Sequence, residues 1–187
     1  ERPDPILPDL LARQKITGPV ALISAGWRHD EARDEPLRAA LKMTIHNLGL
    51  YKAFQEIERQ APELALAYTK KQAEIQKLRD RYRVAATAAL SSCRELYTEH
   101  RNPDCPWFQQ AIRHLQEVDN LWLSEVDTHH QRFEQEIRPF THRLVRAEIA
   151  RLADILRGCE AILIAGGHVG VLRNRLKFFG LDRVLHG

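Results

Sequence analysis

The sequence predicts an α/β fold in which a parallel sheet flanked by helices is interrupted by a long antiparallel α-helical hairpin. Two continuous apolar segments, 19–26 and 160–167, both end in glycine. Short apolar runs of this kind are typical of strands buried on both faces of a parallel sheet. Between them, apolar side chains recur every three or four residues over a long stretch, which indicates helices. The α/β part therefore occupies two separate pieces of the chain.

Size and charge limit the possible functions. A chain of 187 residues is long enough for one well-cored domain with an insertion, and short for two ordinary domains. The formal net charge is only +3, and the basic residues are scattered along the chain. A nucleic-acid interface would need them clustered, so we expect no nucleic-acid partner.

The cysteines and the apolar runs argue against a disulfide-rich, a zinc-binding or a membrane protein. Cys93, Cys105 and Cys159 are odd in number and never spaced C-x-x-C, which argues against a disulfide framework and a thiolate zinc site. We expect no metal, no cofactor and a reducing, cytoplasmic environment. No apolar run approaches the about 18 to 20 residues of a membrane span, so no membrane association is expected.

The first α/β part is assigned to residues 1–54. It contains the strand at 19–26 and a second, more polar strand at 42–50. A helix between them begins at Asp34, a residue type that caps helices, and tolerates Pro36 in its first turn. The β-α-β order predicts a right-handed crossover between parallel strands.

The helical insertion is assigned to residues 55–138. Apolar positions from Leu64 to Leu96 follow a heptad-like seam that only Lys71 interrupts, and a second seam runs from Leu115 to Ile137. A Pro-bearing turn at 100–106 separates them, so we expect two long helices packed antiparallel. The larger aromatic side chains are expected in the hairpin core: Trp107, Trp122 and Phe133.

The second α/β part is assigned to residues 139–187. Pro139 is expected to kink or restart the chain, because its ring excludes a hydrogen-bond donor. An apolar helical face ends before Gly158, and the strand at 160–167 follows, with a further helix after it.

Two histidines in the second hairpin helix are candidates for a metal site. The pairs Glu125/His129 and His130/Glu134 are each four residues apart and would share a helix face. Two ligands on one helix without a third do not make a zinc site, so the pattern favours an ion-paired surface. His129 also falls on the seam, where a packed histidine is expected.

Ser24 follows a strand in a way that suggests a nucleophile elbow. That turn needs a small residue two positions before the serine, where this chain has Leu22, and no helix pattern begins after Gly26. We therefore expect Ser24 and Gly26 to line a binding cleft at the end of the strand, and not to supply a nucleophile.

Gly166 and Gly167 end the strand at 160–167 and allow two explanations. Glycine relieves strain where a strand breaks into a loop. Alternatively, the two backbone N–H groups form an oxyanion hole, which holds negative charge that develops on a substrate oxygen. Both glycine-terminated strands would end at the same edge of the sheet, where ligands of open parallel sheets bind.

The segment "AILIAGGHVGVLRNRLKFFGLDRVL" resembles part of the class I glutamine amidotransferase-like superfamily. The nearest pattern is its serine peptidase branch, with aspartyl dipeptidase and cyanophycinase. The matching positions are Ala165, Gly166, Gly167, His168, Leu172, Leu176, Gly180 and Leu181. The resemblance implies a flavodoxin-like sheet and an oxyanion hole at Gly166 and Gly167. His168 is assigned to binding, although it stands where the branch has asparagine.

In that family a Ser- or Cys-bearing elbow follows this segment, and none follows here. The resemblance thus implies the amino-terminal portion of a hydrolase acting on an amide or small peptide, inactive without its nucleophile. A non-enzymatic oligomerisation module built on the hairpin is the alternative, and a nucleotide binder using the G-G-x-x-G loop ranks below both. The unpaired edge of the strand at 160–167 predicts a homo-oligomer.

Overall fold

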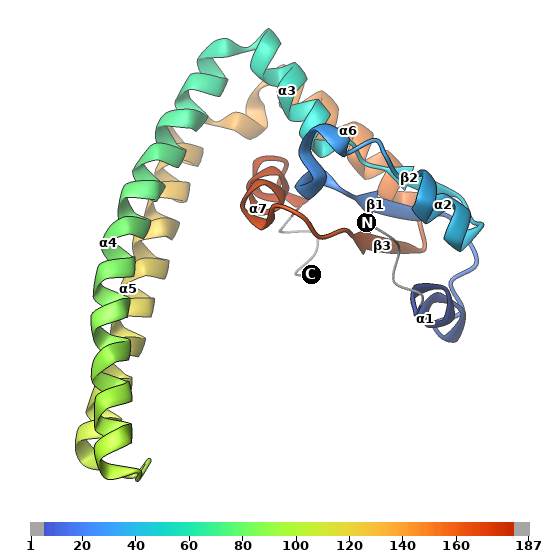
Figure 1. Cartoon of the computed structure of the whole chain (residues 1–187). Helices are drawn as coiled ribbons and strands as arrows, with labels where there is room; N and C mark the ends of the chain where they lie inside the picture. Colours follow the sequence, from blue (N-terminus) through green and yellow to red (C-terminus); the bar gives the residue numbers. More distant parts are fainter. Residues whose placement is uncertain (1–5, 182–187) are drawn as a thin grey trace. The chain divides into compact units, whose positions relative to one another are not determined.

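The structure is a computed structural model that describes residues 6–181, and these fall into two compact units (Figure 1). One unit contains the described residues up to Pro62 together with those from Pro139 onward. The other spans Glu63–Arg138. The first unit holds the sheet and the second is a helical hairpin.

The sheet consists of three parallel strands, β1 (Val20–Ile23), β2 (Ile45–Asn47) and β3 (Ala161–Ile164), in the order β2-β1-β3. Val20 at the start of β1 lies opposite Ile45 on one side and Ala161 on the other. A small parallel sheet built from two distant pieces of chain is therefore present, as expected.

All three strands are shorter than the apolar runs that predicted them, because the chain leaves the sheet early at each carboxyl end. After β1 it turns into a 3-10 helix, η1 (Ala25–Asp30), and after β2 it enters α3 (Leu50–Gln60). Most of the described chain is helical. The structure supports a small parallel sheet with helices, and the flavodoxin-like assignment stays a prediction.

Apolar side chains on one face of the sheet form a core with two short helices. Val20, Leu22 and Ile45 pack with Leu37 of α2 (Glu35–Leu41), and Leu7 of α1 (Leu7–Arg13) lies against this cluster. Side chains alternate along a strand, so Ala21 and Ile23 point to the opposite face, where they are equally buried. Both faces of the central strand are thus covered.

Two of the three further helices in this unit, α3 and α7, pack on each other through aromatic side chains. Phe54 of α3 makes an edge-to-face contact with Phe178 at the end of α7 (Val169–Phe178), with 4.7 Å between ring centroids. Phe178 makes a similar contact with Phe179 at 5.1 Å. The helix expected before Gly158 is present as α6 (Arg143–Arg157), it follows the 3-10 turn η2 (Pro139–Thr141), and α7 spans Val169–Phe178.

The predicted hairpin is formed by α4 (Pro62–His100) and α5 (Pro106–Ile137). Its aromatic contacts show the antiparallel direction, because residues early in α4 meet residues late in α5. Tyr68 contacts Phe133 at 5.9 Å between ring centroids, and Tyr82 stacks on Trp122 at 5.2 Å. None of the helices within residues 6–181 is long and apolar enough to cross a membrane.

Two expectations about the hairpin region need correction. Trp107 is not a core residue: it is 70% exposed, because it is the second residue of α5 and lies beside the turn. Residues 50–60 form a separate helix, α3, although the helical insertion was expected to begin at residue 55. The buried side chains of α3, Leu50, Phe54 and Ile57, give it an apolar face within the sheet-containing unit.

Candidate functional site

The carboxyl ends of β1 and β3 lie side by side, because the strands are parallel neighbours. The loop after β3 follows the end of β1 closely: Ala165 N–H donates to Ile23 O at 2.9 Å, and His168 N–H donates to Gly26 O at 2.8 Å. From β1 the chain continues to β2, which pairs with one edge of β1, whereas β3 pairs with the other edge. Ligands of open parallel sheets bind where neighbouring connections diverge in this way.

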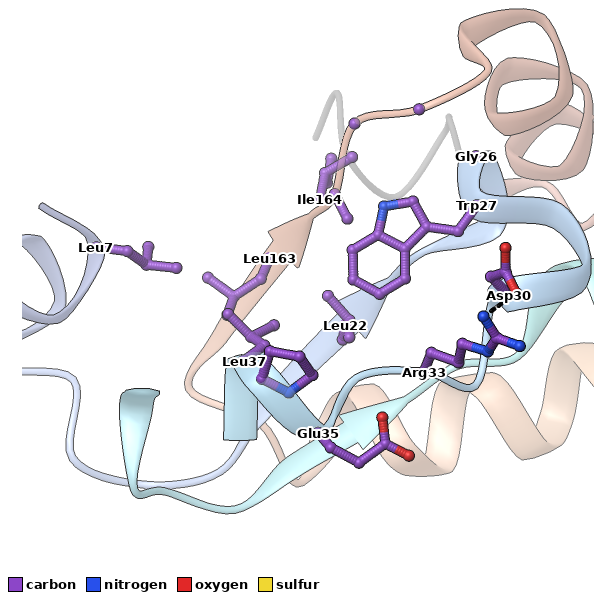
Figure 2. Close-up of a pocket in the computed structure, with 14 residues that line it drawn as sticks. Leu7, Leu22, Gly26, Trp27, Asp30, Arg33, Glu35, Leu37, Leu163 and Ile164 are labelled. Carbon is purple, nitrogen blue, oxygen red and sulfur yellow. Dashed lines mark ion pairs between the residues drawn. The ribbon is translucent and has the colours of Figure 1, made fainter. Parts of the chain in front are cut away.

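A cavity of about 690 Å³ opens beside these two strand ends (Figure 2). Leu22 of β1 and Leu163 of β3 contribute its apolar surface, and Figure 2 shows the Trp27 indole over the same region. Gly26 and residues 165–167 line it as well. This cavity is called the crevice below. Its polar side chains are those of Asp30, Arg33 and Glu35.

Gly167 is glycine for conformational reasons. Its φ is +103°, a left-handed conformation that side-chain-bearing residues rarely adopt. A Cβ at this position would lie 2.6 Å from the carbonyl oxygen of Gly26. Gly26 is constrained in turn, since its own Cβ would lie 2.5 Å from the carbonyl oxygen of Gly166. The two loops therefore touch backbone to backbone, and only glycine fits at both positions.

Gly166 is under no such constraint. A Cβ built there would meet no atom within 4 Å, and its φ lies outside the left-handed region. The residue is exposed. Within residues 6–181, neither the Gly166 nor the Gly167 N–H donates a hydrogen bond. Two free backbone donors and an open space thus occur together at the edge of the crevice.

His168 caps the helix that follows these donors. Its Nδ1 accepts a hydrogen bond from Val171 N–H at 3.2 Å, at the first turn of α7. A helix start has unpaired N–H groups and a partial positive charge. The exposed imidazole thus contributes to the local structure of the loop, and its assignment to binding stays a prediction.

Ser24 is buried and its hydroxyl is fully engaged. The side chain has no exposed surface, and Oγ lies 3.0 Å from Glu31 O and 3.1 Å from Asn47 Oδ1, two acceptors that share its single proton. These bonds connect the end of β1 with η1 and β2. While these hydrogen bonds are formed, the hydroxyl cannot reach a ligand in the crevice. Ser24 does not line the crevice, and its binding role stays a prediction.

A buried polar network that the sequence did not reveal fixes η1 in place. The Glu31 carboxylate accepts hydrogen bonds from Tyr51 N–H at 2.9 Å and Lys52 N–H at 3.0 Å, which caps the start of α3. Asn47 Nδ2 donates to Glu31 O at 2.8 Å. Burial raises the pKa of Glu31, and these hydrogen bonds oppose the rise. Glu31 was missed because it stands among several acidic residues of similar local pattern.

The histidine pairs of the hairpin lie on a helix that also makes an ion-pair contact with the opposite helix. His129 Nδ1 lies 3.1 Å from Glu74 Oε2 on the opposite helix, and this contact holds the hairpin in register. Within the described part of the chain, no group of three or more potential ligands is close enough to hold a metal. The three cysteines are free thiols.

The two unused backbone N–H groups lie at the edge of the crevice, shortly before the start of α7. Backbone N–H groups and helix starts are the usual donors to an oxygen atom that bears negative charge. Among residues 6–181, no serine, threonine or cysteine lines the crevice. The described residues therefore place no hydroxyl or thiol nucleophile in the crevice.

Comparison with protein-family models, with curated proteins and with solved structures found no match to this chain. The amidotransferase-like resemblance therefore stays a prediction that rests on the sequence pattern alone.

Proposed function

We propose that the crevice binds the carbonyl oxygen of an amide substrate, within an amidotransferase-like or serine-peptidase-like hydrolase. One observation carries the proposal: Gly166 lacks a side chain although neither packing nor backbone conformation requires glycine there. An exposed space beside two unused N–H donors is what a ligand oxygen needs.

The chemistry assigned to the site is stabilisation of a tetrahedral intermediate. When a nucleophile attacks an amide carbonyl, the carbonyl oxygen becomes negatively charged, and aimed N–H donors lower the barrier. The Gly166 and Gly167 N–H groups would be those donors. The apolar surface of Leu22, Leu163 and Trp27 would hold the rest of the substrate and exclude water.

A serine or cysteine nucleophile would have to come from outside residues 6–181, because none lines the crevice within them. This chain is therefore expected to bind substrate analogues without turning them over. A chromogenic amide assay should give no product above the buffer rate. Turnover by this chain would show that one of its own residues acts as the nucleophile.

Binding can be tested through the fluorescence of Trp27, which lines the crevice. Suitable probes are acetate, which carries anionic oxygens, and N-acetylphenylalanine amide, which adds an apolar group. We expect saturable quenching by both. A Trp27→Phe variant identifies the signal against the other two tryptophans, Trp107 and Trp122.

The decisive variant is Gly166→Val, whose Cβ would meet no atom within 4 Å and whose methyl groups would occupy the open space, and it is expected to abolish most of the quenching. Gly158→Ala is the matched control. Its Cβ would also have room, and Gly158 precedes the amino end of β3, whereas Gly166 follows the carboxyl end. Equal affinities of Gly166→Val and the parent chain would refute the proposal.

A second candidate function is an interaction module built on the hairpin. The observation in its favour is that large apolar side chains on both helices face solvent, among them Val84 (75% exposed) and Leu121 (64% exposed). Light scattering on Val84→Glu and Leu121→Glu variants tests it. Loss of an assembly in both variants would support the module, and an unchanged mass would count against it.

A further inference from the structure

A second cavity, of about 500 Å³, lies at the carboxyl ends of β1 and β2. The η1 segment separates it from the crevice. Trp27 lines the crevice, whereas the next two residues, Arg28 and His29, line the second cavity. Gly49 and Tyr51, at the start of α3, form part of its wall. We call it the polar cavity.

The acidic groups of the polar cavity are already satisfied by the protein. Asp34 Oδ1 accepts a hydrogen bond from Arg38 Nε at 2.6 Å, and Asn47 Nδ2 donates to Asp34 Oδ2 at 3.2 Å. The Glu31 carboxylate accepts two N–H groups from the start of α3. Asp34 and Glu31 are each only 5% exposed. This side of the cavity is therefore a fixed, buried polar network.

Two basic side chains that line the polar cavity, those of Arg28 and Lys52, lack such partners among the described residues. Within residues 6–181, the side chains of Arg28 and Lys52 form no hydrogen bond and no ion pair. Glu56, one turn from Lys52 along α3, is paired instead with Arg59 at 2.6 Å. Since Arg38 is neutralised by Asp34, the cavity presents an excess of positive charge at Arg28 and Lys52.

The backbone of Arg28 provides an independent indication. Its φ and ψ are 60° and −119°, a conformation that glycine adopts readily and other residues rarely. Residues held in such conformations cluster at functional sites. Glycine would adopt this backbone conformation without strain. The presence of arginine there indicates that its side chain has a function that offsets the strain.

We propose that the polar cavity binds a small anion that carries a carboxylate or phosphate group, held by Arg28 and Lys52. His29 and Tyr51, whose rings meet edge to face at 5.3 Å, form the adjacent wall. The inference is independent of the function proposed for the crevice, because the two cavities share no lining residue.

Inorganic phosphate and succinate are the two probes, titrated into the chain by calorimetry. Constant ionic strength of about 0.1 M limits unspecific attraction between charges more than about 10 Å apart. We expect saturable binding of at least one probe. Tighter binding of phosphate would assign the site to phosphorylated ligands, and tighter binding of succinate would assign it to carboxylates.

Two variants test the residues. Arg28→Gly should weaken binding by about tenfold, as expected for loss of a charged hydrogen bond. It should also raise Tm, because glycine relaxes the backbone at this position. Lys52→Gln should weaken binding to a similar extent and leave Tm unchanged. A structural role of Arg28 would make the variant less stable. Weaker binding together with a higher Tm in Arg28→Gly therefore indicates a ligand-binding role.

Lys42→Gly is the matched control. Lys42 is also basic, exposed and at positive φ (53°), but it ends α2 and does not line the polar cavity. It should leave the affinity unchanged. No saturable binding of either probe, an equal loss of affinity in Lys42→Gly, or a lower Tm in Arg28→Gly would each overturn the inference.

Discussion

Gly166 and Gly167 are adjacent, but they are glycine for different reasons. The sequence left strain relief and oxyanion binding as two explanations for the pair. The geometry assigns strain relief to Gly167, where φ is positive and the Gly26 carbonyl blocks a Cβ. It gives no conformational reason for Gly166. A glycine without a structural requirement is the stronger indication of a binding function.

Alanine should therefore destabilise the chain at Gly167 and leave its stability almost unchanged at Gly166. Gly167→Ala should lower the free energy of unfolding by about 1–3 kcal/mol, because it combines backbone strain with a clash against Gly26. Gly166→Ala should change it by less than about 0.5 kcal/mol. Denaturant unfolding measures both values. Similar losses in the two variants would contradict this distinction.

Asp34 makes stability depend on pH. Mainly the hydrogen bond from Arg38 lowers the pKa of Asp34 below its ordinary value of 3.8. A lowered pKa means that the folded chain binds this proton less readily than the unfolded chain. The stability contributed by the carboxylate is thus present above pH 3.8 and lost as pH falls through the folded-state pKa.

Asp34→Asn should lower the free energy of unfolding at pH 7 by about 1–2 kcal/mol. The variant should also lose less stability than the parent chain on acidification below pH 3.8, because the titrating group is gone. Urea unfolding at several pH values measures both effects. Asp30→Asn is the control, because the Asp30–Arg33 pair is exposed to solvent and should contribute little.

At the level of elements, periodicity predicted the hairpin well and the strand ends poorly. The seams of α4 and α5 depend on local spacing, which the sequence contains. The ends of β1 and β2 depend on tertiary contacts. For example, Glu31 caps the start of α3 from twenty residues upstream, and no local pattern marks that contact.

Lys71 shows how a polar break in a seam is accommodated. The sequence marks it as an interruption, yet it is buried at 8% exposure. Its ammonium lies 4.4 Å from the Tyr68 ring centroid and 4.1 Å from that of Phe133. Cation–π attraction and the long aliphatic stem make a lysine compatible with this position.

The hairpin aromatics provide an element-scale prediction. Phe133→Ala should destabilise the hairpin by about 3 kcal/mol, because the ring is buried against Tyr68. Trp107→Ala should leave stability almost unchanged, because most of the indole faces solvent. Thermal unfolding followed by circular dichroism compares the two. A larger loss in Trp107→Ala would restore the expectation that Trp107 is a core residue.

At the level of the whole molecule, the crevice is assembled from residues about 140 positions apart, a separation that only the fold closes. The parallel direction of the two strands could be predicted, and so could the meeting of Gly26 with Gly166 and Gly167. The contribution of Trp27 and the polar cavity could not, because both depend on the conformation of η1. The sequence identified an edge of the sheet but not two separate cavities along it.

The outer edge of β3 leads to a prediction about assembly. Within the described residues β3 pairs only with β1, and Ile164 is 51% exposed. An exposed apolar strand edge pairs readily with another chain, and lysine at an edge prevents this. We expect a homo-oligomer by light scattering and a shift toward monomer in Ile164→Lys. A monomeric parent chain at tens of micromolar would contradict the expectation.

The most direct test of the central proposal is the backbone amide spectrum of a nitrogen-15-labelled chain during titration with acetate. If the crevice holds an anionic oxygen, the Gly166 and Gly167 N–H resonances should shift together, downfield and saturably, while Gly158 stays fixed. If Gly166 and Gly167 do not move, or move no more than Gly158, these amides do not bind an anionic oxygen and the hydrolase proposal fails.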